Sequence, residues 1–517
     1  MGLATDAHGI DQRTTPFFDA VRAYRDAKII PFHTPGHKQG RGAPADWVAG
    51  LGRTALSLDV SDVLAAPAWD DSWTAVLAVA EGLAARAFGA DFCHFLVNGT
   101  TAGVHAMILA AAAGRKLIAA RNSHRSVIGG IILADAWPVF VEPVMDPTTG
   151  LWLPPPLQAW LRAMDEHPDA AAVLVTYPTY DGAALDLPAL AQAAHERGMA
   201  VLVDEAHGAH FGLHPDLPPR AMAAGADLSA QSPHKLLSGL TQSSWLLGRS
   251  TRISPEATAA VLNVIQTTSP SALLLASLDV ARRQAVLDGP QLLDEAISRA
   301  RTIRRHVETL PGLVCLPSPE VTEAGAEAGA GCRWPAPAAG SLRWDPTKLL
   351  IGVGGLGISG FAAARLLRRF GVQVELAGAG YVLALITLGD TGETVTALCQ
   401  ALERLATEGP ALGDGSMREA APGNVSGLPP PGRQLMRPRA AALSPLRLVP
   451  LSRAHGLVAA DAVCPYPPGI PVLYPGEEVS QEAVEYLQDI LRQGGEVRGL
   501  AWDSDGPKVR VAAPAGR

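Results

Sequence analysis

Short apolar strands alternate with helices between about residues 75 and 250, and this alternation constrains the fold more than any other feature. The apolar runs predict strands at "KLIAA" (116–120), "AAVLVTYP" (171–178) and "MAVLVDE" (199–205), and helical stretches such as "DLPALAQAAHERG" (186–198) separate them. Strands that are apolar on both sides and joined by helices form parallel sheets covered on both faces. The sequence therefore predicts an α/β fold with a mostly parallel sheet in a large domain.

The chain has 517 residues, which is more than one ordinary hydrophobic core accommodates. The changes in pattern along it predict five parts: an N-terminal segment (1–74), a large domain (75–274), a smaller α/β domain (275–407), a Gly/Pro-rich linker (408–442) and a C-terminal module (443–517). We expect a helix over 14–30 and an exposed loop over 320–340.

Composition excludes several classes of function. Lys and Arg number 42 against 50 Asp and Glu, so the net charge of −8 gives no electrostatic case for nucleic acid or an anionic membrane as the main partner. The five cysteines are scattered without a C-x-x-C pair, which argues against a zinc cage or a disulfide framework. We see no apolar signal core and no apolar run of membrane-spanning length. We expect a soluble, cytoplasmic protein without a bound metal.

The stretch "LVNGTTAGVHAMILA" (96–110) is the first of four features that could form part of a binding or catalytic site. It reads as a strand, a turn containing Gly99, Thr100 and Thr101, and the start of a helix. Backbone N–H groups and hydroxyls at a helix N-terminus suit a phosphate. The alternative is an ordinary capped helix.

Two further features follow predicted strands. His124 in "RNSHRSVIGG" can stack on a flat ring, although a lone loop histidine often has no such role. Asp204 ends the strand in "VLVDEAHGAH", where a carboxylate can hold a protonated ring nitrogen, and Ala206 is small enough to let a ring lie against it. A metal cluster in "DEAHGAH" is the alternative, because histidine and carboxylate are good ligands.

The fourth feature is Lys235, in the stretch "AQSPHKLLSGLTQSS" (230–244). A lysine among apolar and hydroxyl residues is costly unless it is paired or neutral, and a neutral lysine is a nucleophile. The alternative is a surface loop with the lysine in water. Together, the four features supply what pyridoxal phosphate requires: a phosphate seat, a stacking group, an anion for the ring nitrogen and a lysine.

A possible dinucleotide fingerprint occurs at "IGVGGLGISG" (351–360), with glycines at 352, 354 and 357. It follows a predicted strand and precedes a helix, as the motif requires. It lies far from any complete mononucleotide-binding repeat, so we do not expect dinucleotide binding.

The chain resembles the Orn/Lys/Arg decarboxylases of pyridoxal-phosphate fold type I, in their short form. The resemblance covers roughly 14–400 and 440–500, and it rests on these motifs in combination: "PFHTPGHKQGRG" (31–42), "NGTTAG", "RNSHRS", "DEAHGAHF", "SPHKLLSGLTQS", "TTSPSALLLASLD" (267–279) and "PYPPGIPVLYPGE" (465–477). The glycine-rich 351–360 segment also matches this family's small domain.

The resemblance implies a role for each matched residue. Lys235 would be the Schiff-base lysine, with Ser232 and His234 near the phosphate or the reaction centre. For the cofactor, the resemblance implies that Gly99, Thr100 and Thr101 hold the phosphate, Asp204 pairs with the ring nitrogen, His124 stacks on the ring, and Ala206 and His207 line it. It also implies that Thr268 reaches across a dimer interface. His33, His37 and Glu477 would contact the substrate, with Glu477 binding the distal positive group of the substrate.

The resemblance also implies the activity: decarboxylation of arginine, lysine or ornithine by a homodimer or larger homo-oligomer, with Lys235 or His234 returning a proton. The alternatives that share the cofactor machinery are an aminotransferase and a carbon–sulfur lyase. A non-catalytic cofactor-binding protein is a further alternative from another class.

Overall fold

The computed structural model describes residues 11–61, 73–145, 151–316, 342–378, 380–412, 429–466, 470–492 and 495–512. The chain forms two compact units, Met1–Ala110 with Ala200–Asp294 and Ala111–Met199 with Glu295–Arg517, here called the first and second unit. All of the expected loop at 320–340 and part of the expected linker lie outside the described residues.

The first unit contains strands β1, β8, β9 and β10 of the large sheet and the helices around them. Its elements are α1 (Pro16–Asp26), α2 (Ala45–Leu51), α3 (Arg53–Leu58), α4 (Trp73–Phe88), β1 (Phe92–Leu96), α5 (Gly99–Ala112), β8 (Ala200–Glu205), β9 (Leu228–Gln231), α9 (Pro233–Leu236), β10 (Ser244–Gly248), α10 (Pro255–Ile265) and α11 (Ala272–Leu287). Strand β8 pairs parallel with β9, whereas β10 runs antiparallel to both β9 and β1. Every residue of β8, β9 and β10 is buried, as apolar strands covered on both faces require.

The second unit begins with the rest of that sheet. Its elements up to residue 200 are β2 (Lys116–Ala120), α6 (Arg125–Ala134), β3 (Trp137–Val141), β4 (Val144–Met145), β5 (Trp152–Leu153), α7 (Leu157–Glu166), β6 (Ala172–Thr176), β7 (Ala183–Ala184) and α8 (Leu187–Glu196). Strand β2 pairs parallel with β3 and with β6. The seven-stranded order is β1-β10-β9-β8-β6-β2-β3, so the prediction of a mostly parallel sheet is confirmed.

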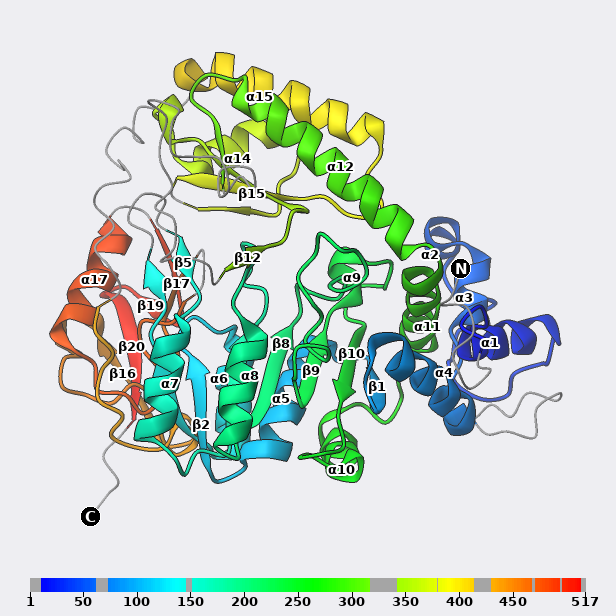
Figure 1. The fold of residues 1–517 in the computed structure, drawn as a ribbon, viewed down its shortest axis with the longest axis horizontal. Helices are drawn as coiled ribbons and strands as arrows, with labels where there is room; N and C mark the ends of the chain where they lie inside the picture. Colours follow the sequence, from blue (N-terminus) through cyan, green and yellow to red (C-terminus); the bar gives the residue numbers. More distant parts are fainter. Residues whose placement is uncertain are drawn as a thin grey trace. The chain divides into compact units, whose positions relative to one another are not determined.

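A second sheet in the same unit is antiparallel throughout. The elements here are α12 (Gly289–Glu308), β11 (Val314–Leu316), β12 (Arg343–Trp344), β13 (Lys348–Gly352), α14 (Gly360–Arg369), β14 (Leu376–Ala377), β15 (Tyr381–Leu385) and α15 (Gly392–Leu412). Strands β11, β13, β15 and β14 form the sheet, and α12, α14 and α15 lie along it (Figure 1). Since β13 has antiparallel neighbours, the glycines that follow it do not belong to the parallel strand–helix–strand unit of a dinucleotide fold.

The C-terminal part of the second unit has its own small core. Its elements are α16 (Pro438–Ala442), β16 (Leu446–Pro450), β17 (Cys464–Tyr466), α17 (Gln481–Arg492), β18 (Glu496–Arg498), β19 (Ala501–Asp503) and β20 (Gly506–Ala512). Strand β20 lies between β16 and β19, and buried side chains such as Leu473, Leu487 and Val509 pack together beneath them. Among the described helices, none is long and apolar enough to cross a membrane.

A buried ion pair on α11 holds the N-terminal helix α1 in place within the first unit. Asp279 Oδ2 on α11 accepts hydrogen bonds from the backbone N–H groups of Phe17 (3.0 Å) and Phe18 (3.4 Å), at the start of α1. Arg282 Nη2 donates to Asp279 Oδ1 at 2.7 Å, and both side chains are fully buried. The carboxylate thus satisfies helix N–H groups that have no partner within the helix.

We predict that Asp279→Ala lowers the free energy of unfolding by about 3–5 kcal/mol, because it leaves Arg282 buried without its charge partner. Urea unfolding followed by circular dichroism measures the effect. Asp26→Ala, which removes a surface partner of Arg25, is the control and should cost about 1 kcal/mol or less. Equal losses in the two variants would contradict this account.

The last residue of β8, Glu205, is fully buried and ties the strand to its surroundings. Its carboxylate accepts hydrogen bonds from Ser229 Oγ (2.6 Å), Gln231 Nε2 (2.8 Å) and the Ala221 N–H (2.8 Å). Burial raises the pKa of Glu205 to about 7, and these hydrogen bonds oppose the rise without cancelling it.

Glu205 therefore makes unfolding depend on pH. Between its unfolded pKa of about 4.5 and its folded pKa of about 7, the folded state holds the proton more tightly, so stability falls as pH rises through this window. We predict that Glu205→Gln removes this slope, measured as the free energy of unfolding at pH 5 and pH 7.5. Exposed Glu256 is the matched control, and Glu256→Gln should keep the parent slope; an unchanged slope in Glu205→Gln would show that another group titrates.

Candidate active site

Three hydroxyl groups meet at the start of helix α5. Thr100 Oγ1 lies 2.5 Å from Ser232 Oγ and 2.8 Å from Ser244 Oγ, and Ser244 Oγ donates to the Gln231 carbonyl at 2.6 Å. Gly99 begins the helix with φ of +73°, a conformation that favours glycine. The structure thus joins two predicted phosphate-site residues, Thr100 and Ser232, at a helix N-terminus suited to an anion. Thr101 is exposed on the same turn.

Close packing holds α5 against the sheet at this point. A Cβ at Gly103 would lie 2.9 Å from the Cβ of Ala230 and 3.1 Å from Leu96 Cδ1. A side chain larger than hydrogen would therefore push the helix away from β9. The small residues of "NGTTAG" place the helix N-terminus beside the residues that follow β9.

Lys235 lies on α9, the single turn that follows β9. Its Nζ is 2.9 Å from His207 Nε2, and His207 is buried while Lys235 is half-buried. The lysine is therefore not the solvent-directed side chain of an ordinary surface loop. The structure brings together Lys235 and His207, which the sequence predicts to share a site.

His234 precedes the lysine and has a defined tautomer. Its Nδ1 lies 2.8 Å from the Ser243 carbonyl, an acceptor, so Nδ1 carries the hydrogen and Nε2 holds the lone pair in the neutral ring. Burial lowers the pKa of His234, and the charge of Lys235 lowers it further. The hydrogen bond to Ser243 raises this pKa but does not outweigh the other two effects. His234 is therefore neutral near pH 7.

Asp204 is buried near the carboxyl end of β8, directly opposite Ala230 of β9. Its Oδ1 accepts a hydrogen bond from the Ala206 N–H at 3.2 Å. Parallel strands end at the same edge of a sheet, so the residues after β8 and β9 lie on one side of it. That edge carries Asp204 and Ala206 from one strand, and Ser232, His234 and Lys235 from the next.

His124 belongs to the second unit, where it is the N-cap of α6. Its Nδ1 accepts a hydrogen bond from the Ser126 N–H at 3.2 Å and lies 2.8 Å from Ser126 Oγ, and the residue is exposed. Its predicted stacking role remains a prediction. The cap fixes which edge of the ring faces the helix.

Glu477 has a partner that the sequence analysis missed. Its Oε1 and Oε2 lie 2.7 Å and 3.0 Å from Arg121 Nη1 and Nη2, and both side chains are 2% exposed. Arg121 directly follows β2 and opens the "RNSHRS" motif, which was the available signal. The structure therefore gives the Glu477 carboxylate an ion pair within its own chain, and its substrate role remains a prediction.

The histidines of the "HTPGHK" segment make local contacts in the first unit. His33 Nε2 lies 2.7 Å from the Tyr24 hydroxyl. His37 Nε2 lies 3.1 Å from Asp59 Oδ2, and its Nδ1 accepts from the Gly40 N–H at 3.1 Å. Their substrate roles also remain predictions.

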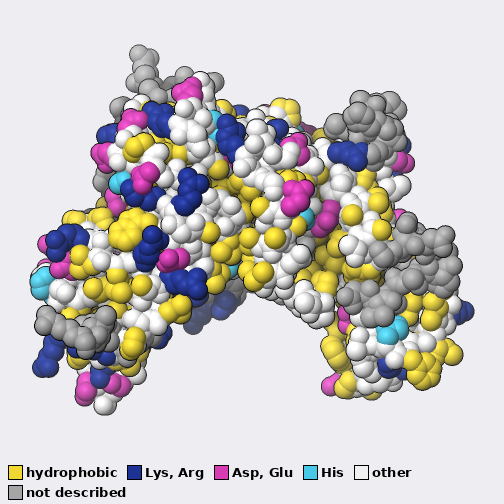
Figure 2. Space-filling model, turned by 90° about the horizontal axis from the view of Figure 1, so that it is seen from below, with side chains coloured by type: hydrophobic (Ala, Val, Ile, Leu, Met, Phe, Trp, Pro, Cys, Tyr) yellow, Lys and Arg dark blue, Asp and Glu magenta, His cyan; other side chains and the backbone are white. Residues whose placement is uncertain are grey.

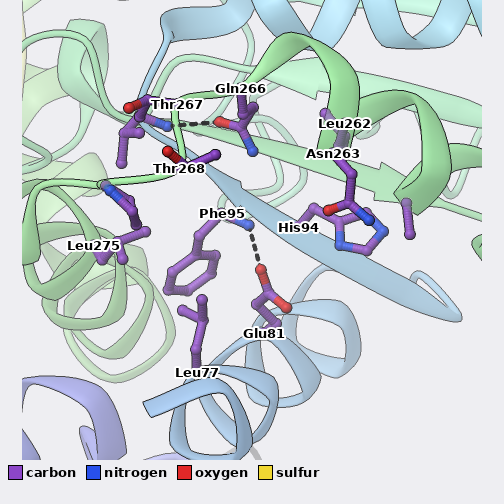
Figure 3. Close-up of a pocket in the computed structure, with 13 residues that line it drawn as sticks. Leu77, Glu81, His94, Phe95, Leu262, Asn263, Gln266, Thr267, Thr268 and Leu275 are labelled. Carbon is purple, nitrogen blue, oxygen red and sulfur yellow. Dashed lines mark hydrogen bonds between the residues drawn. The ribbon is translucent and has the colours of Figure 1, made fainter. Parts of the chain in front are cut away.

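Thr268 lies in a different place from the other predicted residues of the first unit. It lines a cavity of about 240 Å³ with Glu81, His94 and Asn263, and among the described lining residues it is the one predicted from the sequence to belong to the site (Figure 3). Burial raises the pKa of Glu81 to about 8, although the Phe95 N–H donates to it at 2.7 Å. Neither Lys235 nor His207 is among the described residues that line this cavity.

The alternative metal site in "DEAHGAH" finds no support in the part of the chain that the structure describes. There, no three His, Cys, Asp or Glu side chains are arranged to hold a metal ion. Glu205 is engaged with Ser229 and Gln231, and His207 with Lys235.

Comparison with known proteins is consistent with this geometry. A family model described as "Orn/Lys/Arg decarboxylase, major domain" matches residues 15–394, and one described as "Orn/Lys/Arg decarboxylase, C-terminal domain" matches residues 433–514. The chain is 36% identical to proteins named arginine decarboxylase from Bacillus anthracis and Bacillus subtilis (strain 168), over 95% of this chain and 96% of each relative.

The solved structure of a lysine decarboxylase from Francisella novicida matches with a TM-score of 0.81 at 20% identity, covering 96% of this chain and 81% of that one. At this identity the match shows the fold alone, and it confirms the predicted fold class. Because the family models span most of the sequence, the chain belongs to the Orn/Lys/Arg decarboxylase family.

Proposed function

We propose that this protein decarboxylates a basic amino acid with pyridoxal phosphate, and that arginine is the preferred substrate. One observation carries the proposal: the sheet edge that holds Asp204 also holds Lys235, whose Nζ lies 2.9 Å from buried His207. The 36% identity to named arginine decarboxylases, over nearly the full length of both chains, supports arginine over lysine or ornithine.

The residues present fit this cofactor. The hydroxyls of Thr100, Ser232 and Ser244 converge at the N-terminus of α5, as a phosphate requires. Asp204 supplies a buried carboxylate for a ring nitrogen, and Lys235 supplies an amine for the aldehyde carbon. Pyridoxal phosphate, when bound, supplies an electron-withdrawing ring that accepts the electrons released with CO₂.

The chain's own groups have separate tasks in this mechanism. The Asp204 carboxylate favours the protonated form of a ring nitrogen beside it, because an opposite charge stabilises a cation. Neutral His234 presents the Nε2 lone pair, so it can accept a proton and return it to the substrate carbon. His207 holds the Lys235 amine in place. The proposed contacts of His124 with the ring, and of His33 and His37 with the substrate, follow from their family positions.

The surface supports a small-molecule substrate. On the face drawn in Figure 2, basic and acidic side chains are interspersed, in keeping with the net charge of −8. A nucleic-acid surface would gather basic residues in one patch.

We further propose a homodimer or larger homo-oligomer in the cytoplasm. In the first unit Phe32 is 95% exposed and Val264 is 83% exposed, an arrangement that self-association would cover. Four cysteines in the described part of the chain are free, in keeping with a reducing compartment.

We predict that the purified protein with pyridoxal phosphate releases CO₂ from arginine faster than from lysine or ornithine. The assay measures CO₂ and the amine product for each amino acid at equal concentration. Formation of a keto acid without CO₂ would indicate an aminotransferase instead. No product from any of the three would contradict the proposal.

We predict that Lys235→Ala abolishes CO₂ release and leaves the circular dichroism spectrum unchanged. The amine is required for the chemistry, whereas alanine is compatible with the helical turn α9 on which Lys235 lies. Lys116→Ala is the matched control, since Lys116 forms an ion pair with Asp169, whose carboxylate is exposed. Parent-level activity in Lys235→Ala would remove the lysine from the mechanism.

A further inference from the structure

Two segments of the C-terminal part, which we call together the clamp, contact the chain on either side of helix α6: residues 472–478 contact Arg121, four residues before the helix, and residues 433–442 contact its C-terminal end. The segments are joined to each other, because the Leu435 N–H donates to the Gly476 carbonyl at 2.9 Å. Gly476 has φ of +90°, and a Cβ there would lie 2.2 Å from the Met436 carbonyl oxygen. Only glycine permits this close approach, so the clamp is one connected piece.

The clamp holds the chain just before α6 through Arg121. The guanidinium makes the two-point contact with Glu477 and also donates from Nη2 to the Val472 carbonyl at 3.1 Å. The Tyr474 hydroxyl donates to the Arg121 carbonyl, and the Tyr474 N–H donates to Glu477 Oε2 at 3.2 Å. Both backbone and side chain of Arg121 are therefore fixed by residues of the clamp.

Aromatic rings close this contact from water. The Arg121 Cζ lies 4.7 Å from the ring centroid of Tyr474 and 5.5 Å from that of Phe140. Burial alone would lower the pKa of Arg121, but the hydrogen bonds and charge of Glu477 outweigh it and raise the pKa. Since the Arg121 charge is buried and paired, moving either side chain away from the other would cost stability.

The clamp also holds the far end of α6. Arg437 Nη1 donates to the Asp135 carbonyl at 2.5 Å, and Arg439 Nη1 donates to the Leu133 carbonyl at 3.0 Å. These carbonyls have no partner within the helix, and the C-terminus of a helix favours positive charge. Helix α16, within the clamp, packs against α6.

His124 lies between these two attachments, three residues after Arg121 and at the N-cap of α6. The position of its ring depends on the segment 121–124 and on the first turn of the helix. The clamp holds the start of this stretch at Arg121 and the C-terminal end of α6 at Leu133 and Asp135.

We infer that Glu477 is a positioning residue that acts through Arg121 on His124, and that the clamp fixes the backbone from Arg121 to α6 that carries this ring. The inference rests on the proposed function, because it assigns His124 a contact with pyridoxal phosphate. It differs from the prediction that Glu477 binds the substrate: all three hydrogen bonds found for its carboxylate come from Arg121 and Tyr474.

The first test does not depend on cofactor or activity. Hydrogen–deuterium exchange of the full chain, measured without added pyridoxal phosphate, compares Glu477→Gln with Glu478→Gln. Glu478 is the matched control, since its carboxylate pairs with Arg433, which is largely exposed. We expect faster exchange confined to 121–134 and the clamp in Glu477→Gln, because the Tyr474 N–H of the clamp also loses its charged acceptor, and no change in Glu478→Gln. Unchanged exchange there, or an equal increase throughout the chain, would overturn the inference.

The second test asks whether Glu477 acts through His124. We expect Glu477→Gln to weaken pyridoxal phosphate binding by up to about tenfold, comparable to loss of a ring contact. In a His124→Ala background the same substitution should have little further effect. An additive loss in the double variant would indicate a role independent of His124. A raised KM for arginine with unchanged cofactor affinity would instead place Glu477 at the substrate.

A variant at the other end of the clamp guards against a folding failure in Glu477→Gln. Arg437 is partly exposed, so Arg437→Gln should leave the free energy of unfolding nearly unchanged. We expect faster exchange near 131–135 together with weaker cofactor binding, in the same direction as for Glu477→Gln. Parent-level cofactor affinity despite faster exchange would separate α6 from the cofactor and overturn the inference. If all variants bind cofactor normally while the parent decarboxylates arginine, the proposed function stands and the clamp does not.

Discussion

The parallel pairing of β8 with β9 determines where this chain can do chemistry. Asp204 lies opposite Ala230 and Glu205 opposite Gln231, so the residues that follow the two strands leave the sheet at the same edge. The buried Glu205 carboxylate holds this register through Ser229 and Gln231 of β9. A slip of one residue would reverse the faces of the strand and turn the Asp204 side chain to the opposite face of the sheet. The site depends on this register.

In the second unit, the buried pair of Arg121 and Glu477 likewise holds two segments together through a buried carboxylate. A charge removed from water needs a partner with good geometry, and here two parallel hydrogen bonds supply it. The family's major and C-terminal domain matches meet at this pair, since Arg121 lies in the first match and Glu477 in the second. The carboxylate of Glu477, which ends the proline-rich segment 465–477, thus binds the Arg121 guanidinium of the same chain.

Local pattern predicted the sheet well and the partners of charged groups poorly. The strands at 116–120, 171–178 and 199–205 occur as β2, β6 and β8 because continuous apolar runs have few other solutions. Strand direction in the smaller sheet was not predictable, since burial is similar in either direction. Helix α1 ends at Asp26, earlier than the expected helix over 14–30, since Ala27 is its C-cap and Lys28 adopts a positive φ.

The residues of the candidate site have two sources in the sequence, and their roles stay predictions. Thr100, Asp204 and Lys235 follow from motifs at strand ends, where parallel sheets place their sites, whereas Ser232 and His207 follow from the family resemblance. Ser244 completes the hydroxyl cluster but lies on β10, and nothing local distinguishes its hydroxyl from those of its neighbours. Arg121 and Glu477 are separated by hundreds of residues, so their pairing is a property of tertiary structure.

The most direct test of the central claim is to locate the cofactor on the chain. The protein is loaded with pyridoxal phosphate, reduced with borohydride, digested and analysed by mass spectrometry. The account predicts that the visible absorption band disappears and that the added mass lies on the peptide containing Lys235. Stable labelling of another lysine, with Lys235 unmodified, would contradict it.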